Sequence, residues 1–439
     1  MSVWSLDARW RGDSPSSLDD ASVAPAVSSR RAFLLCVAAL AIPVAGGVVA
    51  YIYQLTQGLS VTGLNDEVFW GVYTVDLVTF IGFSYGGALV SAILRLTNAS
   101  WRGPISRIAE ATAVVTLIIG ALFPIIHIGR PERLWEMFVR PQINSPQLWD
   151  MVAIGTYLLA TLVLFSLPLI PDLARLREGN GIGGWRARFY RWGSFGWRGT
   201  EVQRRTLNRA LTIVAIAIIP LAIMVHTVLS YAFSLTSRPG WHSTIFGPDF
   251  VIAAVYSGIA IVILASVAYR RVYRLEKWID ERSIRFLAYL MVAMGVAYAY
   301  FTFTEVTTVG YVGGREEAPV LYGLMLDRYA PLFWGFVVMG LVVPVLLVAF
   351  RKTRTIAGIT IAAGLVVGAM WLKRFLIIVP TLAPSLLGDS YGSYTPSWVE
   401  VMVTVGAAAA IPLLLVLLFR VVPVLSADEI EELNDQVRS

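Results

Sequence analysis

The feature that most constrains this chain is a series of ten apolar runs, each near the roughly 20 residues that a helix needs to cross the hydrocarbon of a bilayer. With 57% hydrophobic and only 15% charged residues, a soluble fold would run short of polar residues for its exterior. Backbone polar groups in lipid must be satisfied within their own segment, so each run is predicted to be helical. We therefore predict an all-α integral membrane protein with ten spans: 32–54, 69–94, 109–128, 149–170, 208–234, 249–269, 284–309, 332–350, 356–378 and 398–421.

The basic residues are divided unevenly between the loops. The N-terminal tail, the loops after the second, fourth, sixth and eighth runs, and the C-terminal tail hold 27 of the 35. Because cytoplasmic loops carry the excess of Lys and Arg, these segments are predicted to be cytoplasmic. We expect a multi-pass protein of a bacterial or archaeal cell membrane with both termini inside. The loop 175–209, the most basic, also contains three tryptophans and is predicted to lie on the inner leaflet.

The segments outside the spans are short. We interpret residues 1–31 as a cytoplasmic tail, 32–421 as one transmembrane domain and 422–439 as a second cytoplasmic tail. The sequence 29–34, SRRAFL, is also typical of a twin-arginine export signal, but the nine further spans favour a first span with a basic flank. The net charge of +6 is spread over the loops, so we expect no nucleic-acid partner. A single cysteine, Cys36, excludes an internal disulfide and an iron–sulfur cluster held by this chain alone.

Ionisable residues inside spans are costly, so each is a candidate functional residue. With the predicted orientation, all of them lie in the outer part of the membrane. This shared location favours one site with a proton path over eight unrelated placements of ionisable residues. They are Asp76, His127, Asp150, His226, Asp249, Glu305, Lys373 and Arg374. Glu110 and Arg95, at the inner boundary, are interpreted as ordinary interface residues.

Some of these residues have a simpler interpretation. Asp150 and Asp249 each stand where a helix begins, and an acid there caps free amides and suits the helix dipole. Lys373 and Arg374 are close enough to the end of their span to extend toward the outer headgroups. His226 and Glu305 lie deeper, so a functional role is favoured for them.

Two kinds of redox site fit these residues. His127 and His226 lie at similar depth on different spans, as two axial ligands of a haem b would. However, the chain has only three histidines and no repeated His pairs. A quinol site needs only an apolar slot, with a histidine and an acid that hydrogen-bond the quinol oxygens and accept protons. We therefore favour a quinol site, with no haem, metal or cluster held by this chain.

Three motifs are unusually specific for loops: HIGRP at 127–131 with NSPQLWD at 144–150, IPD at 170–172, and HTVLS at 226–230 with PGWHSTIF at 239–246. In this order they resemble the NrfD/PsrC family of quinone-interacting membrane subunits, and especially the ten-span subunits of alternative complex III, a quinol-oxidising respiratory complex. The resemblance implies two four-helix bundles, spans 2–5 and 6–9, plus one flanking helix at each end of the chain.

The resemblance also implies partners and a site. The expected partners are an extracytoplasmic iron–sulfur subunit, multihaem cytochrome c subunits, a second NrfD-like membrane subunit and membrane lipid. Menaquinol or ubiquinol would bind at the outer face, in a respiratory or photosynthetic electron-transport complex in which this chain alone is not catalytic. The resemblance places His127, Asp150, His226 and Asp249 near the quinol and its proton exit. The candidates for the proton path are Asp76, Glu305, Lys373 and Arg374.

At one place the chain departs from the family pattern. The segment after His226 often carries an acid in the subunits of alternative complex III, whereas here it reads Ser230-Tyr231-Ala232-Phe233. This leaves open a proton-translocating paralogue without a working quinone site. A secondary transporter is an alternative from another class, although the spans lack the paired Gly or Pro interruptions typical of transporters.

Overall fold

The computed structural model describes residues 30–99, 101–178, 184–236, 238–273, 275–276, 278–312, 314, 317–385 and 391–425. Within these residues ten helical segments are long and apolar enough to cross a bilayer, which confirms the predicted all-α membrane fold. They are α2 (Arg30–Gln57), α3 (Val72–Leu96), α4 (Arg102–His127), α6 (Pro146–Ser166), α9 (Glu201–Ser234), α10 (Phe246–Val272), α11 (Glu281–Val312), the segment α13–η3–α14 (Ala330–Ala349), α15 (Ile356–Leu382) and α16 (Trp398–Leu418). The predicted tails lie outside the described residues, except for 30–31 and 422–425.

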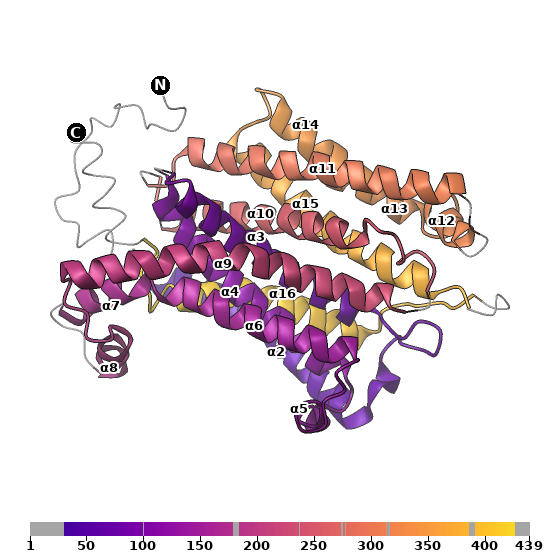
Figure 1. Cartoon of the computed structure of the whole chain (residues 1–439), viewed down its shortest axis with the longest axis horizontal. Helices are drawn as coiled ribbons and strands as arrows, with labels where there is room; N and C mark the ends of the chain where they lie inside the picture. Colours follow the sequence, from indigo (N-terminus) through magenta and orange to yellow (C-terminus); the bar gives the residue numbers. More distant parts are fainter. Residues whose placement is uncertain are drawn as a thin grey trace.

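Eight of the spans form the two predicted four-helix bundles (Figure 1). The first contains α3, α4, α6 and α9, and the second contains α10, α11, the α13–η3–α14 segment and α15. The bundles meet chiefly where α3 packs along α10. Because α3 and α10 lie between neighbours on several sides, most of their side chains are buried, including polar ones.

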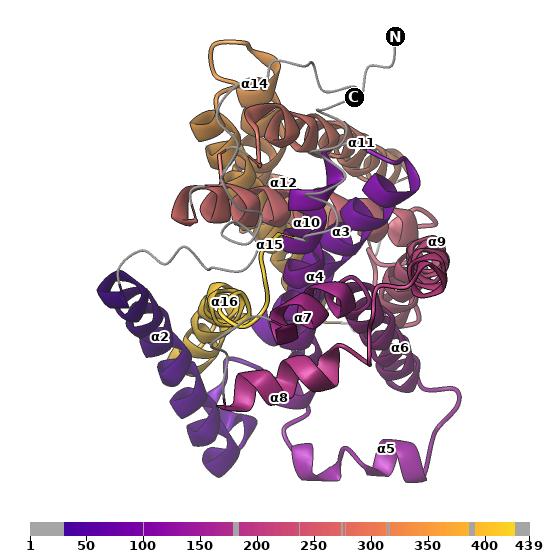
Figure 2. The ribbon, with the colours of Figure 1, turned by 90° about the vertical axis from the view of Figure 1, so that its left-hand side faces the viewer.

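The first and last spans pack on each other beside the first bundle. Figure 2 shows α2 next to α16, with α16 between α2 and the bundle. A Cβ atom at Gly47 would lie only 3.0 Å from the Cα of Gly406, so small residues let these two helices approach closely. The two flanking helices that the resemblance implies therefore form a pair.

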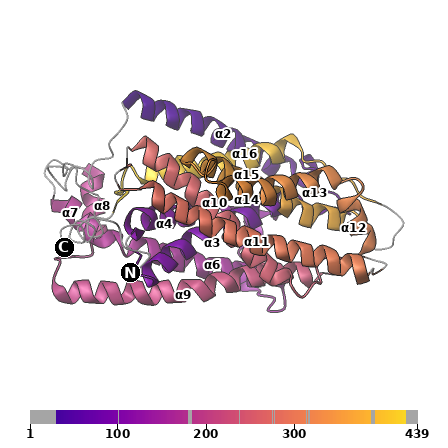
Figure 3. The same cartoon turned by 90° about the horizontal axis from the view of Figure 1, so that it is seen from above.

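Short helices mark the two ends of the molecule (Figures 1 and 3). At one end lie η1 (Leu59–Val61), η2 (Pro131–Arg133), α5 (Glu136–Val139) and α12 (Ala318–Met325), and we call this the α12 end. At the other lie α7 (Leu169–Glu178) and α8 (Gly184–Gly193), and we call this the α8 end. The basic loop predicted to be cytoplasmic forms the α8 end, so the α12 end corresponds to the predicted outer face.

The eighth span is not one regular helix, although its sequence predicts a continuous one at 332–350. It is divided into α13 (Ala330–Phe336), the π-helical turn η3 (Val337–Val342) and α14 (Val343–Ala349). The hydroxyl of Tyr256 on α10 donates a hydrogen bond of 2.6 Å to the carbonyl oxygen of Gly340 within this turn. A widened turn leaves backbone groups short of their usual partners, and a buried tyrosine satisfies one of them here.

Candidate functional site

A group of buried charges lies between α10, α11 and α15 near the α12 end. The Nζ atom of Lys373 is 3.6 Å from Oε2 of Glu305, and their side chains are 4% and 23% exposed. Asp249 is buried and interacts electrostatically with Glu305, Lys373 and Arg374. We call these four residues the Lys373 cluster. All four were predicted as site residues, and the fold brings them together from three helices.

Arg374 reaches away from Lys373 because adjacent residues on a helix point about 100° apart. Its Nη2 donates a hydrogen bond of 3.0 Å to Oγ of Ser257 on α10. A Cβ atom at Gly82 of α3 would lie 2.6 Å from the same nitrogen. A glycine at this position therefore makes room for the guanidinium, which lies where the two bundles meet.

Several buried polar atoms around this cluster have no hydrogen-bond partner within the described part of the chain. They are both ring nitrogens of His226, Oδ1 of Asp249, the hydroxyls of Tyr298 and Thr302, and Nη1 of Arg374. A buried polar group without a partner costs about 1–3 kcal/mol, so native proteins keep few of them. Their concentration at one place is typical of a site that binds a ligand, water or protons.

His226 belongs to the same region. It lies on α9, is 1% exposed, and interacts electrostatically with Arg374. The ring of Tyr85 on α3 meets its imidazole edge-to-face, with 4.8 Å between the ring centroids. His226 therefore extends the Lys373 cluster into the first bundle.

A cavity of about 60 Å³ adjoins Lys373 and Glu305. Apolar and aromatic side chains form most of its wall, among them Trp241, Phe246, Phe333, Leu321 and Leu324. Leu321 and Leu324 belong to α12, so this short helix covers one side of the cavity. The arrangement combines an apolar slot with a charged pair at one side, as small-molecule sites commonly do.

The PGWHSTIF motif forms another part of this wall. Trp241 is fully buried, and its Nε1 donates a hydrogen bond of 2.9 Å to the carbonyl oxygen of Ile377 on α15. Its ring stacks on that of Trp70, with centroids 5.8 Å apart. Just before the motif, Arg238 donates to the carbonyl oxygens of Leu382 and Pro384. The loop between α9 and α10 is thereby fixed to the end of α15.

Asp76 lies in a different polar group, between α2, α3, α15 and α16. Its Oδ1 accepts a hydrogen bond of 2.7 Å from Nε1 of Trp371, and its Oδ2 accepts one of 2.5 Å from the hydroxyl of Thr404. Asp76 also interacts electrostatically with Glu400, which is fully buried. Unlike Asp249, Asp76 has protein partners for both oxygens.

Glu400 was missed by the sequence analysis, yet it holds three segments together. Its Oε2 accepts hydrogen bonds from the backbone N–H groups of Gly63, at 2.7 Å, and Ser397, at 2.8 Å. Its Oε1 accepts one of 2.6 Å from the hydroxyl of Tyr394. Burial, together with the charge of Glu400, raises the pKa of Tyr394 above its usual value, so this hydroxyl stays protonated and donates at neutral pH.

A signal that could have identified Glu400 is its position in a capping box with Ser397 at the start of α16. We call Asp76, Glu400, Tyr394 and two further residues, Gln54 and Tyr73, the Glu400 cluster. The hydroxyl of Tyr73 donates to Oε1 of Gln54, and Tyr73 interacts electrostatically with Glu400 and Asp76.

His127 and Asp150 lie at the α12 end but outside the Lys373 cluster. His127 ends α4 and interacts electrostatically with Glu400, while Asp150 lies one turn inside α6. Both are partly buried, and Nδ1 of His127 and Oδ1 of Asp150 have no partner among the described residues. Neither Asp150 nor Asp249 makes a capping hydrogen bond, because Ser145 and Ile245 occupy the N-cap positions.

The IPD motif lies far from this site, at the α8 end. Its Asp172 forms a buried ion pair with Arg107, with Nη2 to Oδ2 at 2.7 Å. Glu110, one turn further along α4, is also buried and accepts a hydrogen bond of 2.5 Å from Ser91. Glu110 is therefore part of the helix packing, and interpreting it as an ordinary interface residue was wrong.

The described residues contain no group of three or more His, Cys, Asp or Glu side chains that could hold a metal ion. The Lys373 cluster itself consists of acidic, basic and hydrogen-bonding side chains. Proton transfer and recognition of a polar head group with an apolar body are what such groups can perform.

Comparison with known proteins finds relatives over most of the chain. A selenate reductase subunit of Mesobacillus selenatarsenatis is 24% identical over 402 residues, covering 86% of this chain and 91% of that protein. An Hdr-like menaquinol oxidoreductase integral membrane subunit of Archaeoglobus fulgidus is 25% identical over 404 residues, covering 87% and 92%. A Halobacterium salinarum protein, provisionally named as a dimethyl sulfoxide reductase membrane subunit, is 25% identical over 395 residues, covering 82% and 84%.

The family described as polysulphide reductase, NrfD, matches residues 60–383. This range begins before α3 and ends just after α15, so it contains both four-helix bundles, the Lys373 cluster and its cavity. The chain is a multi-pass membrane protein, and it belongs to the NrfD family, as the three motifs predict.

Proposed function

We propose that this chain is the membrane subunit of a respiratory or photosynthetic complex that oxidises quinol at the α12 end. Electrons would pass to an extracytoplasmic iron–sulfur subunit, since the single cysteine of this chain cannot hold a cluster. The observation that carries the proposal is the Lys373 cluster: Lys373 and Glu305 line an apolar cavity, and Asp249 and Arg374 beside them have buried polar atoms without a partner within the described residues. The names of the relatives, which include a menaquinol oxidoreductase membrane subunit, support the same class of substrate.

The residues present fit a quinol. The aromatic walls at Trp241, Phe246 and Phe333 suit an apolar ring, and Glu305 and Lys373 lie at the side where its oxygens would hydrogen-bond. A cavity of about 150 Å³ holds benzene, whereas this one measures about 60 Å³. Entry of a ring therefore requires side chains to move, and those of α12 cover the cavity.

A bound quinol supplies two electrons and two protons when it is oxidised. Asp249 and His226 are candidates to accept these protons, because each has a buried atom without a partner within the described residues. Lys373 and Arg374 stabilise negative charge on Asp249 and Glu305 before the proton arrives. Trp241 and Phe246 keep water from the apolar side of the pocket.

The loop charges predict that the α12 end is the outer face, so the protons would be released outward. Asp76 and His127, both within electrostatic reach of Glu400, offer a route on the side of the first bundle. Asp150, whose Oδ1 lacks a partner within the described residues, lies at the same end and is a further candidate for proton transfer. Multihaem cytochrome c subunits and a second NrfD-like subunit remain expected partners.

The experiment compares variants of the complex purified from native membranes. Asp249→Asn and His226→Gln should each slow quinol oxidation by on the order of 10²-fold, as is typical when a positioned proton acceptor is lost. Asp66→Asn is a matched control, because Asp66 is an exposed acid at the same end and should leave the rate unchanged. His127→Ala tests the proposed proton route on the side of the first bundle. Bound quinone is extracted and quantified in every preparation.

The outcomes separate the alternatives. Unchanged turnover in both Asp249→Asn and His226→Gln would contradict the proposed site. A complex without bound quinone, in which Asp76→Asn or Glu305→Gln abolishes proton translocation but not electron flow, would identify the proton-translocating paralogue. Solute uptake by the chain without any co-purifying iron–sulfur subunit would identify a transporter.

A further inference from the structure

A second cavity lies at the opposite end of the molecule, between α7, α9 and the loop that joins α8 to α9. Its volume is about 140 Å³, which equals roughly four or five water molecules. Its charged lining consists of Arg175, Arg198, Arg204 and one acid, Glu178. The proposed quinol chemistry at the α12 end makes no use of it.

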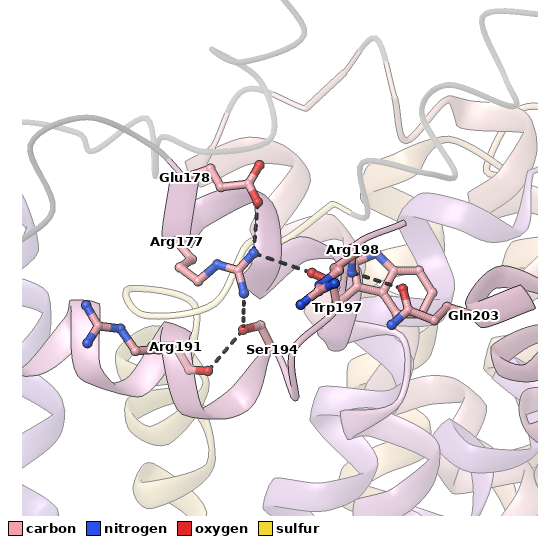
Figure 4. Close-up of polar contacts among 7 residues, drawn as sticks. All are labelled: Arg177, Glu178, Arg191, Ser194, Trp197, Arg198 and Gln203. Atoms are coloured by element: carbon pink, nitrogen blue, oxygen red, sulfur yellow. Dashed lines mark hydrogen bonds and ion pairs between the residues drawn. The ribbon is translucent and has the colours of Figure 1, made fainter. Parts of the chain in front are cut away.

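Arg177 fixes the shape of this cavity without lining it (Figure 4). Its Nη2 donates a hydrogen bond of 2.8 Å to Oε1 of Glu178 and one of 3.4 Å to the carbonyl oxygen of Trp197. Its Nη1 donates to Oγ of Ser194 at 3.3 Å. One guanidinium therefore ties α7 to the end of α8 and to the following loop, and it neutralises the acid in the wall.

Two of the arginines in the lining, Arg198 and Arg204, are available for a ligand. Within the described residues, the guanidinium groups of Arg198 and Arg204 make no hydrogen bond or ion pair, although the backbone N–H of Arg198 donates to Oε1 of Gln203 at 3.0 Å. With Glu178 paired to Arg177, the remaining charge around the cavity is that of arginines. Arginine is the side chain best suited to phosphate oxygens, because its planar fork donates two parallel hydrogen bonds.

The length of α9 and the exposed tryptophans of α8 predict that the cavity lies at the level of a membrane surface. The 34 residues of α9 span about 51 Å, whereas the hydrocarbon is about 30 Å thick, so the first turns, with Arg204, extend into the headgroup region. On the neighbouring α8, Trp185 and Trp192 are 61% and 73% exposed. Tyr190 on the same helix is buried and donates to the carbonyl oxygen of Val421. Exposed tryptophans on a helix held against the end of the last span are typical of an interfacial segment.

We propose that this cavity binds a phosphate group, and that the group is the headgroup phosphate of an anionic membrane lipid. Arg198 and Arg204 contact the phosphate oxygens, Arg175 adds charge, and Trp197 lies beside the glycerol and upper acyl chain. Basic pockets between helices on the cytoplasmic side bind lipid headgroups in this way. Free inorganic phosphate has the same chemistry, so the experiment distinguishes the two sources.

The test uses the full chain in detergent, titrated with phosphatidylglycerol or with zwitterionic phosphatidylcholine and read out by native mass spectrometry. The wild type should prefer phosphatidylglycerol, and Arg198→Gln/Arg204→Gln should weaken its binding roughly tenfold. Arg186→Gln/Arg205→Gln is the matched control, since it removes the same charge from the same end. Arg205 is paired with Glu201, and Arg186 lies over the ring of Trp185.

A second titration uses inorganic phosphate alone, followed by the broadening of its phosphorus resonance. Selective loss of phosphatidylglycerol binding in Arg198→Gln/Arg204→Gln supports a lipid headgroup. If Arg198→Gln/Arg204→Gln loses inorganic phosphate binding but keeps phosphatidylglycerol binding, the lipid assignment is overturned and the cavity is a phosphate site with a soluble occupant. Equal losses in the two double variants, or no preference for phosphatidylglycerol in the wild type, would overturn the proposal, because general positive charge would then explain the binding.

Discussion

Gly86 of α3 and Gly258 of α10 face each other so closely that a Cβ atom on either would overlap the backbone of the other. This contact joins the two bundles. We expect Gly258→Ala to lower stability by about 1–3 kcal/mol, because the added methyl group forces the helices apart. Thermal unfolding of the purified protein in detergent measures the effect.

Gly368→Ala on α15 is the matched control for this substitution. A Cβ atom there meets nothing within 4 Å, and alanine is favoured over glycine in a helix by roughly 0.5–1 kcal/mol. The control should therefore unfold at the same temperature or slightly higher. If Gly258→Ala unfolds no earlier than Gly368→Ala, the glycine contact does not hold the bundles together.

Lys373→Gln should destabilise the protein by roughly 3 kcal/mol, because removing one partner of a buried ion pair leaves the other charge uncompensated. Glu305→Gln in the same chain should recover much of this loss, since the unpaired carboxylate is then removed. A double-mutant cycle on unfolding free energies gives the interaction. The exposed pair Arg133 and Glu136, 2.9 Å apart, serves as control and should show no measurable interaction. Additive effects of Lys373→Gln and Glu305→Gln would argue against the pair.

Tyr394→Phe should cost about 2–3 kcal/mol, because it leaves two buried groups without a partner. The hydroxyl donates to Glu400 at 2.6 Å and accepts from the backbone N–H of Val72 at 2.9 Å. Tyr391→Phe, at an exposed tyrosine nearby, should change stability little. Chemical unfolding of the two variants side by side decides the matter, and equal stabilities would show that the Tyr394 hydroxyl is dispensable.

Asp172→Asn separates stability from activity. Asp172 and Arg107 are 2% and 1% exposed, so loss of this ion pair should cost roughly 3–5 kcal/mol. The pair lies at the α8 end, away from the Lys373 cluster, so quinol oxidation per folded complex should stay at the wild-type rate. Turnover normalised to the folded fraction is the measurement. A proportional loss of both quantities would connect this ion pair with the reaction.

The sequence predicts the number of helices and the fold class because the length of each apolar run can be read directly from the residues. Each predicted span overlaps a helix, and the family resemblance adds the two bundles. The turn at Val337–Val342 could not be foreseen, since its sequence is as apolar as an ordinary helix. The Tyr256 hydroxyl donates a hydrogen bond to Gly340 in this turn, and only the folded arrangement brings the two together.

The candidate site was predictable to a similar degree. Because an ionisable side chain inside a span is energetically costly, the sequence alone identifies such residues as candidate site residues. The fold then brings four of them together: Asp249, Glu305, Lys373 and Arg374. The division of the remaining acids was not predictable, because it depends on how the helices pack. Asp76 faces Trp371 and Thr404, in a separate group organised by Glu400. The roles of these residues in quinol binding and proton transfer remain predictions.

The pairing of α2 with α16 has a consequence for biogenesis. When these ten spans enter the membrane in chain order, eight others follow α2 before its main packing partner, α16, is made. Until then α2 faces lipid along most of its length. Closure of Gly47 against Gly406 is therefore possible only once α16 has been made, and this contact joins the first of these ten spans to the tenth.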